Sequence, residues 1–340
     1  MKTKDIYKNM EEDINSSNLD EATKKRVFEN IFKLKEQKVN LMITGATGCG
    51  KSSTINAMFN TDVAKVGIGV DPETMEIKKY ELDNLILWDS PGLGDGKEKD
   101  IQHSKGIISK LNELDSKGNP LIDLVLVILD GGSRDLGTSY ELINQVIIPN
   151  LGDSAKDRIL IAINQADVAM KGRYWDDENN KPQPKLVEFL EDKVQSVKQR
   201  VKEATKVDVE PIYYSAGYKD DDEAQNPWNL SKLLYFIVTN TPAEKRLSYV
   251  NNLSDKKEMW ENDDELIDYR EEVQKSFVET IIETAEAGAE TGAEIGREIG
   301  EFFGKGKTGE AIGTVVGGTI GAVVGGVKAV ASAIGSLFSW

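Results

Sequence analysis

Short apolar runs alternate with longer mixed segments between residues 39 and 214. The runs cover residues 39–44, 85–88, 124–129, 159–163 and 212–214. Runs of this length without alternating polar residues are typical of strands that are buried on both faces. Residues 52–59, 140–146, 186–201 and 228–237 instead space their apolar positions as helices do. This alternation predicts an α/β fold with a doubly wound, mostly parallel sheet.

The pattern changes on both sides of this region. Residues 1–37 predict an N-terminal helical segment, residues 38–245 the α/β domain, and residues 246–277 a charged connecting helix. Residues 278–340 carry glycines at four-residue intervals, from 288 to 304 and again from 309 to 325. This spacing places each run on one helical face, where two backbones can touch. We therefore predict a C-terminal Gly-rich helical hairpin, a glycine zipper.

Three interpretations of this tail stay open. Residues 311–340 carry Lys328 as their only charge, and they exceed the roughly 20 residues needed to cross a bilayer, which favours a membrane-active element. A soluble zipper hairpin or oligomerisation module is the second interpretation. A disordered tail is the third, and the strict glycine period argues against it.

A glycine-rich turn joins the first strand to the first helix and fits the pattern G-x-x-x-x-G-K-[ST]. Glycines let backbone N–H groups approach phosphate, and the following helix points its positive end at the same anion. Lys51 supplies charge for the β- and γ-phosphates, and the Ser52 hydroxyl can bind Mg²⁺. The residues expected around the phosphates are Gly45, Thr47, Gly48, Cys49, Gly50, Lys51, Ser52 and Ser53.

A second motif, Asp89-Ser90-Pro91-Gly92, follows the 85–88 strand and fits D-x-x-G. Asp89 can hold Mg²⁺ through water, and the Gly92 N–H can bond the γ-phosphate and so sense its loss. A threonine that binds both Mg²⁺ and the γ-phosphate is expected between the first helix and the strand at 75–82. Thr74 is the best candidate and Thr61 the second.

Two further elements lie at strand ends. Asn164-Gln165-Ala166-Asp167 resembles the guanine-reading N-K-x-D motif of GTPases, and Ser215-Ala216 resembles the element that backs the guanine O6. The order of all these motifs over residues 38–245 resembles the Era-like bacterial GTPases of the TRAFAC class, with likeness to dynamin-type, septin-type and immunity-related GTPases. The resemblance implies GTP and GDP as ligands together with Mg²⁺. It places Asn164, Gln165, Asp167, Ser215 and Ala216 at the base, and Ser52, Thr74 and Asp89 at the metal.

The chain departs from the family pattern at two positions. Gln165 stands where the motif has lysine, and Leu93 stands where Ras-like proteins carry the glutamine that orients water. We expect the missing catalytic group to come from elsewhere, such as a paired subunit. Arg134 is a candidate because it follows the 124–129 strand on the ligand edge of the sheet. The expected catalytic set is Lys51, Thr74, Gly92 and Arg134.

Composition and charge limit the classes of binding partner and the cellular location that we expect. The net charge of −16 argues against nucleic acid as a partner, because its phosphates would be repelled. Cys49 is the only cysteine, so no disulfide can form within the chain, and His103 is the only histidine. The N-terminus lacks the apolar stretch of a signal peptide, which favours a cytoplasmic location, peripheral to or inserted in the inner membrane if the tail is membrane-active.

These observations predict an enzyme that hydrolyses GTP to GDP and phosphate with Mg²⁺, slowly or when assembled. It would act as a nucleotide switch that controls the C-terminal membrane or oligomerisation module, and self-association is expected. The alternative is a slow or inactive GTPase that serves as a nucleotide-gated assembly or membrane-effector protein. An ATPase is a weaker third hypothesis, which the Gln165 substitution keeps open.

Overall fold

The computed structural model describes residues 21–59, 76–94, 96–219 and 224–286, together with Lys8, Glu11 and Asn15. The chain divides into two compact units. One comprises residues 39–241 and 252–269, and the other comprises residues 1–38, 242–251 and 270–340. The predicted switch threonine, Thr74, its alternative Thr61 and nearly all of the predicted glycine-zipper hairpin lie outside the described residues.

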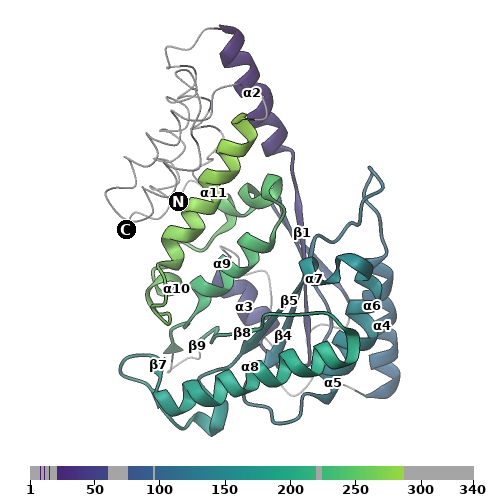
Figure 1. The fold of residues 1–340 in the computed structure, drawn as a ribbon, viewed down its shortest axis with the longest axis vertical. Helices are drawn as coiled ribbons and strands as arrows, with labels where there is room; N and C mark the ends of the chain where they lie inside the picture. Colours follow the sequence, from purple (N-terminus) through teal and green to yellow (C-terminus); the bar gives the residue numbers. More distant parts are fainter. Residues whose placement is uncertain are drawn as a thin grey trace. The chain divides into compact units, whose positions relative to one another are not determined.

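The larger unit is built on a six-stranded sheet with the order β2-β3-β1-β4-β5-β8 (Figure 1). Its parallel strands are β1 (Val39–Gly45), β3 (Leu85–Asp89), β4 (Leu124–Asp130), β5 (Ile159–Asn164) and β8 (Ile212–Tyr213). The edge strand β2 (Lys78–Leu82) pairs antiparallel with β3. All residues of β1, β3 and β5 are buried, as their unbroken apolar runs predict. The predicted mostly parallel α/β sheet is confirmed.

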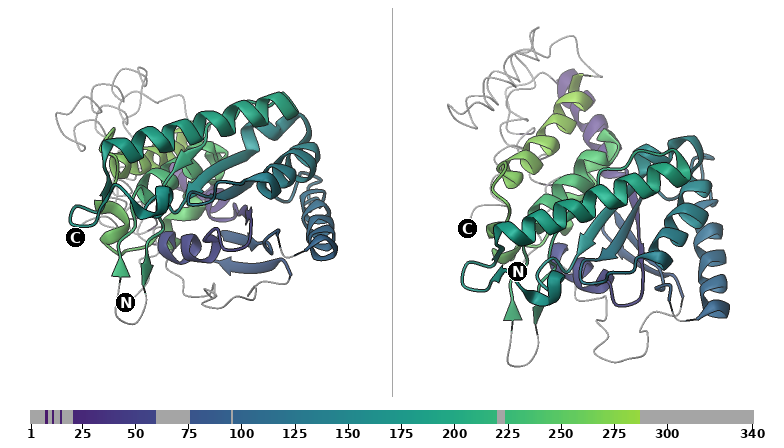
Figure 2. Two further views of the ribbon diagram at one scale, coloured as in Figure 1. Left: turned by 90° about the horizontal axis from the view of Figure 1, so that it is seen from below. Right: turned by 60° about the horizontal axis from the view of Figure 1, so that its bottom comes forward.

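Helices cover both faces of this sheet (Figures 1 and 2). One face is covered by α4 (Lys97–Leu111), the π-helical segment η1 (Leu142–Ile147) and α8 (Pro184–Thr205). Both α4 and α8 contact η1, and residues of all three belong to one apolar core. On the other face, α3 (Lys51–Met58) contacts α9 (Leu230–Asn240), and α9 contacts α10 (Glu258–Glu261). Successive side chains of a strand point to opposite faces of the sheet. Val125, Val127 and Leu129 of β4 therefore share one face, and they belong to the core that also contains residues of α4 and α8.

The helical stretch that follows β4 changes its winding. It begins as α5 (Gly137–Glu141), widens into η1 and ends as α6 (Ile148–Leu151), followed by η2 (Gly152–Ser154) and α7 (Ala155–Arg158). Pro149 is the second residue of α6, two positions after the end of the π segment. Proline has no N–H to donate and its ring crowds the preceding turn, so the wider turn accommodates it within the helix.

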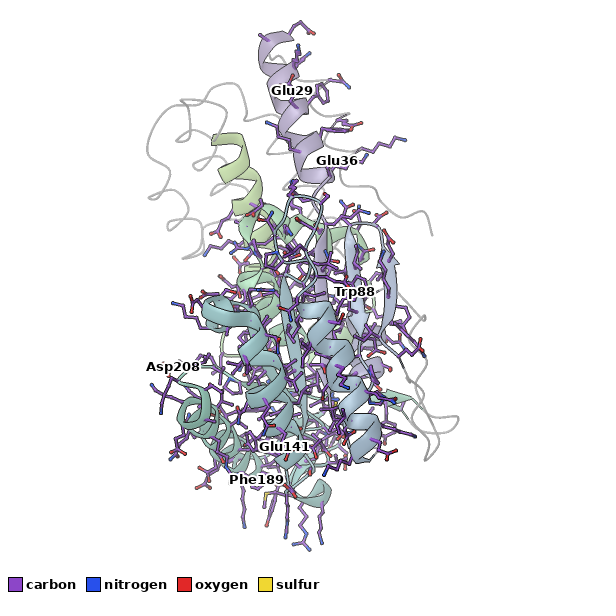
Figure 3. The ribbon with its side chains drawn as sticks, turned by 90° about the vertical axis from the view of Figure 1, so that its right-hand side faces the viewer. Glu29, Glu36, Trp88, Glu141, Phe189 and Asp208 are labelled. Carbon is purple, nitrogen blue, oxygen red and sulfur yellow. The ribbon has the colours of Figure 1, made fainter. Side chains whose placement is uncertain are left out.

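Trp88 on β3 shows how the sheet meets α4 (Figure 3). Its indole N–H donates to Asn40 Oδ1 at 3.0 Å, and the Lys110 ammonium lies 4.2 Å from the ring centroid. The ring thus gains a hydrogen bond within the sheet and a cation–π contact from the helix.

Two short pairs of strands lie outside the six-stranded sheet. After η3 (Ala169–Gly172), β6 (Trp175–Asp176) pairs antiparallel with β7 (Lys181–Pro182) in a short hairpin. Further along, β9 (Tyr218–Lys219) pairs with β10 (Ala224–Gln225). Trp175 and Trp228 stand edge to face with centroids 5.8 Å apart, so the first hairpin is held by aromatic packing that its polar composition conceals.

The predicted continuous connecting helix over 246–277 is wrong. The chain forms a 3₁₀ helix, η4 (Ala243–Asn252), then α10, and then α11 (Tyr269–Glu286). Residues 252–269 return to the larger unit, where the Ser254 N–H donates to Met58 O at 2.9 Å and the Asp264 N–H donates to Asn229 Oδ1 at 2.8 Å. Asp263 accepts a bond from the Glu265 N–H, and such local side-chain bonds compete with the helix.

The smaller unit contains α2 (Glu21–Lys35), η4 and α11. The Ser248 hydroxyl of η4 donates to Gln37 O at 3.1 Å, which joins η4 to the segment after α2. No helix in the described part of the chain is both long and apolar enough to cross a bilayer.

Candidate functional site

The predicted site residues that the structure describes gather at one edge of the sheet, because the strands that carry them are parallel. Ile43 of β1 lies opposite Asp89 of β3, and Asp130 of β4 lies opposite Asn164 of β5. The segments that leave these strand ends therefore emerge side by side. In open α/β sheets this carboxyl edge is where ligands bind.

The phosphate loop runs from the end of β1 to the start of α3. Gly50 has φ of +87°, and a Cβ placed on it would lie 2.2 Å from Asn164 Nδ2, so both its backbone and its neighbour require glycine. Lys51 is buried and its ammonium donates to Ala46 O at 3.1 Å. The Lys51 charge therefore lies over the loop itself, and Ser52 and Ser53 follow it in the first turn of α3.

Helix α3 is anchored to β8's end by a buried pair of hydroxyls. Thr54 Oγ1 donates to Gly50 O at 2.8 Å and lies 2.7 Å from the Tyr214 hydroxyl. Burial raises the pKa of Tyr214 well above its ordinary value, so this hydroxyl stays protonated. Burial also raises the pKa of Cys49, which therefore stays a thiol rather than a reactive thiolate.

The D-x-x-G segment lies directly against the phosphate loop. Asp89 is fully buried at the end of β3. The Thr47 N–H donates to Leu93 O at 3.0 Å, and the Leu93 N–H donates to Gly45 O at 3.4 Å. A Cβ on Gly92 would lie 2.6 Å from both the nitrogen and the Cα of Thr47, so only glycine permits this approach.

Leu93 is 4 % exposed and belongs to the hydrophobic core beside α4. An apolar side chain turned into the core cannot orient a water molecule at a γ-phosphate. The structure thus explains why leucine stands at this position, because its side chain packs in the core.

Asn164 joins three parts of the site. It is 2 % exposed, its Nδ2 donates to Cys49 O at 2.9 Å, and its Oδ1 accepts from the Ala216 N–H at 2.9 Å. Asn164 is the last residue of β5, and its single amide group therefore binds both the phosphate loop and the Ser215–Ala216 element. The Ser215 hydroxyl accepts a bond from the Gly217 N–H at 3.3 Å, which closes the turn behind it.

Gln165 and Asp167 complete the base-reading motif. Gln165 has φ of +61°, and its side-chain amide donates to Gly48 O at 3.1 Å, so it reaches the phosphate loop as a donor without a charge. Asp167 is 8 % exposed, and among the described residues nothing hydrogen-bonds its buried Oδ1. Such an acceptor fits the N1 and N2 donors of guanine, since buried polar atoms otherwise carry a desolvation cost.

The loop after β4 is held by Lys193 of α8, which sequence reasoning missed. Its ammonium donates to Asp130 O at 3.1 Å, Gly131 O at 2.7 Å and Ser133 O at 2.7 Å. Burial lowers the pKa of Lys193 and the nearby Asp130 carboxylate opposes that shift. The available signal was its place on the apolar side of the helix, three residues after Leu190 and one before Val194.

Arg134 lies in the same loop and is exposed. No hydrogen bond or ion pair within the described residues holds its side chain, and none joins it to Lys51 or Asp89.

The residues present fit Mg²⁺ with a nucleotide. The Ser52 hydroxyl and the Asp89 carboxylate are oxygen donors at the same sheet edge, and Mg²⁺ favours one or two such ligands together with substrate phosphates. In the described ranges, no group of three or more His, Cys, Asp or Glu side chains could hold a metal by itself.

Comparison with known proteins agrees with this geometry. Residues 40–165 match the model of the 50S ribosome-binding GTPase family. The uncharacterised Escherichia coli K12 proteins YkfA and YfjP are each 28 % identical, over 157 and 148 residues. These alignments cover 45 % and 42 % of this chain and 50 % and 47 % of those proteins, so the chain spans about half the length of these relatives. The septin homolog spn6 of Schizosaccharomyces pombe is 33 % identical over 124 residues, which is 28 % of this chain and 32 % of spn6.

Solved structures resemble this chain at low similarity. Era in complex with MgGDPNP and nucleotides of 16S ribosomal RNA has a TM-score of 0.40 at 20 % identity, over 61 % of this chain and 58 % of Era. Toc33 from Arabidopsis thaliana with Mg²⁺ and GMPPNP has a TM-score of 0.37 at 17 % identity, over 60 % of this chain and 82 % of Toc33. At these values neither resemblance is evidence for a shared partner or activity.

Proposed function

We propose that the protein binds GTP with Mg²⁺ and hydrolyses it to GDP and phosphate as a nucleotide switch, because residues 40–165 match a GTPase family model. The observation that carries this proposal is Asn164. Its two hydrogen bonds tie the phosphate loop to the base-reading elements beside Asp167. A site that joins a phosphate cradle to a buried guanine acceptor fits a guanine nucleotide better than ATP.

Each residue has a role in this proposal. Lys51 neutralises the β- and γ-phosphates. Ser52 and Asp89 would hold Mg²⁺, which would supply positive charge to stabilise phosphoryl transfer. Gly92 senses the γ-phosphate through its N–H. Asn164 and Gln165 hold the loops in register, while Asp167 and the Ser215–Ala216 turn select guanine. Thr74 would complete the metal site.

We propose that hydrolysis is slow in the isolated subunit, because Leu93 is packed into the core and cannot orient water. A second subunit could then supply the missing charge, with Arg134 as the candidate because its side chain is exposed at the ligand edge. The expected rate should rise with protein concentration. A rate per subunit that stays constant over a hundredfold range of concentration contradicts activation by assembly.

The second candidate function is a nucleotide-gated assembly or membrane-effector protein with little or no turnover. Buried Leu93 favours it, and the output would be the glycine-rich tail, which lies outside the described residues. Flotation with liposomes tests this, using the full chain and a chain ended after Glu286, where α11 ends. The membrane output is supported if the full chain floats in the presence of a GTP analogue and the shortened chain does not. It is excluded if neither chain floats.

Calorimetry with GTP and ATP tests the main proposal. We expect tight binding of GTP and at least tenfold weaker binding of ATP. Lys51→Ala should abolish GTP binding or turnover, while the exposed Lys97→Ala should not. Equal affinity for both nucleotides, or unchanged GTP binding by Lys51→Ala, would overturn the assignment.

A further inference from the structure

We propose that His103 is a positioning residue that holds the γ-phosphate sensor Gly92 and couples it to helix α4. The inference rests on the proposed function, since it assigns a regulatory contact to the same site. His103 is the one histidine of the chain and is 7 % exposed on α4. Its Nδ1 lies 3.1 Å from Gly92 O.

The direction of this hydrogen bond follows from chemistry. A carbonyl oxygen can only accept, so Nδ1 must carry the proton and act as the donor. The imidazole therefore fixes one side of the Gly92 peptide. The Gly92 Cα also lies against the phosphate loop, where Thr47 leaves no room for a Cβ.

Glycine needs such a restraint more than other residues do. Without a Cβ it has more backbone conformations to lose when it is held in one place. The Gly92 N–H, one peptide away from the bonded carbonyl, can point steadily at a γ-phosphate only if those conformations are limited. The His103 bond restrains Gly92, and the backbone bonds of Thr47 and Leu93 hold the same segment against the phosphate loop.

Helix α4 is tied to this segment at a second point. Asp100 Oδ1 accepts from the Gly94 N–H at 2.9 Å, three residues before His103 on the same helix. The α4 helix also contacts η1 and α6, and with η1 it borders a groove of about 690 Å³ lined by Leu93, Ile101, Leu142 and other residues. Glu141, which Figure 3 labels, also lines this groove. A shift of Gly92 when phosphate is lost therefore reaches α4 and the shape of this surface.

The single histidine allows a direct spectroscopic test. We expect the full chain labelled with ¹⁵N-histidine to show one imidazole, with Nδ1 protonated when GMPPNP and Mg²⁺ are bound. Replacing GMPPNP by GDP should shift that signal, because the sensor is released. An imidazole spectrum that is the same with both nucleotides, or a bare Nδ1 with GMPPNP, overturns the proposal.

Substitutions test the energetic consequence. His103→Ala should lower the ratio of GMPPNP affinity to GDP affinity about fivefold, the size of one net hydrogen bond. His103→Asn should keep the ratio within about twofold of wild type, because the asparagine Nδ2 can occupy the place of the histidine Nδ1. Gln102→Ala changes an exposed neighbour on the same helix and serves as the matched control.

The outcomes distinguish a failure of the proposed function from a failure of the role of His103. If wild type binds neither guanine nucleotide, the proposed function fails. If wild type binds both, but His103→Ala keeps the wild-type ratio or His103→Asn behaves like His103→Ala, only the role of His103 fails. Should His103→Ala not fold, the wild-type spectra still decide.

Discussion

The structure makes its most specific prediction for the replacement of Asn164. Asn164→Ala removes the donor to Cys49 O and the acceptor of the Ala216 N–H, both at 2.9 Å. Cys49 and Ala216 are themselves buried, so water cannot easily replace the lost partners. The change should therefore lower both the stability of the fold and the affinity for nucleotide.

The magnitude follows from these two bonds. Each contributes about 1 kcal/mol net, and a buried group left without its partner costs about 1–3 kcal/mol. Allowing for partial relaxation around the small cavity, we expect a loss of about 2–4 kcal/mol in the free energy of unfolding. Because Cys49 lies in the phosphate loop, GDP affinity should fall at least about tenfold, which corresponds to roughly 1.4 kcal/mol.

Urea unfolding of the full chain, followed by tryptophan fluorescence, measures the stability, since Trp175 and Trp228 are buried in the same unit. Asn112→Ala is the matched control. It also removes two side-chain bonds, to Ile108 O at 2.9 Å and to Asn150 Oδ1 at 3.0 Å, but both are exposed. It should cost under about 0.5 kcal/mol. If Asn164→Ala costs no more than Asn112→Ala, the bridging role is refuted.

Three further substitutions probe the rest of the site. Asp167→Asn should weaken GTP and favour xanthosine triphosphate, because an amide can pair with the C2 carbonyl, and competition binding that still prefers GTP contradicts this. Lys193→Met should cost about 2–3 kcal/mol in urea unfolding, because three loop carbonyls lose a charged donor, and a loss below about 0.5 kcal/mol would rule the clamp out. Gly50→Ala should abolish GDP binding in calorimetry, because its Cβ would meet Asn164 Nδ2 at 2.2 Å at a φ of +87°. Retained binding would mean that the loop is arranged differently.

The order of the strands in the chain and the chemistry at their ends were readable from the sequence. Unbroken apolar runs specify strands buried on both faces, and short motifs such as Gly45 to Ser52 carry their geometry within a few consecutive residues. The predicted parallel sheet and the gathering of Lys51, Asp89 and Asn164 at one edge follow from that local information. The bounds of β1, β3, β4 and β5 accordingly differ from the expected ones by one residue.

Only the tertiary structure decided which distant groups meet. The bonds from Asn164 to Cys49 and Ala216, from Lys193 to the loop after β4, and from His103 to Gly92 join residues between 11 and 115 positions apart. The break in the predicted 246–277 helix has the same origin, since its turn is bonded to Asn229. Helical periodicity records which face of a segment is apolar, but not which backbone carbonyl a buried polar side chain will find. That choice depends on strand order and packing, which arise only when the whole sheet has assembled.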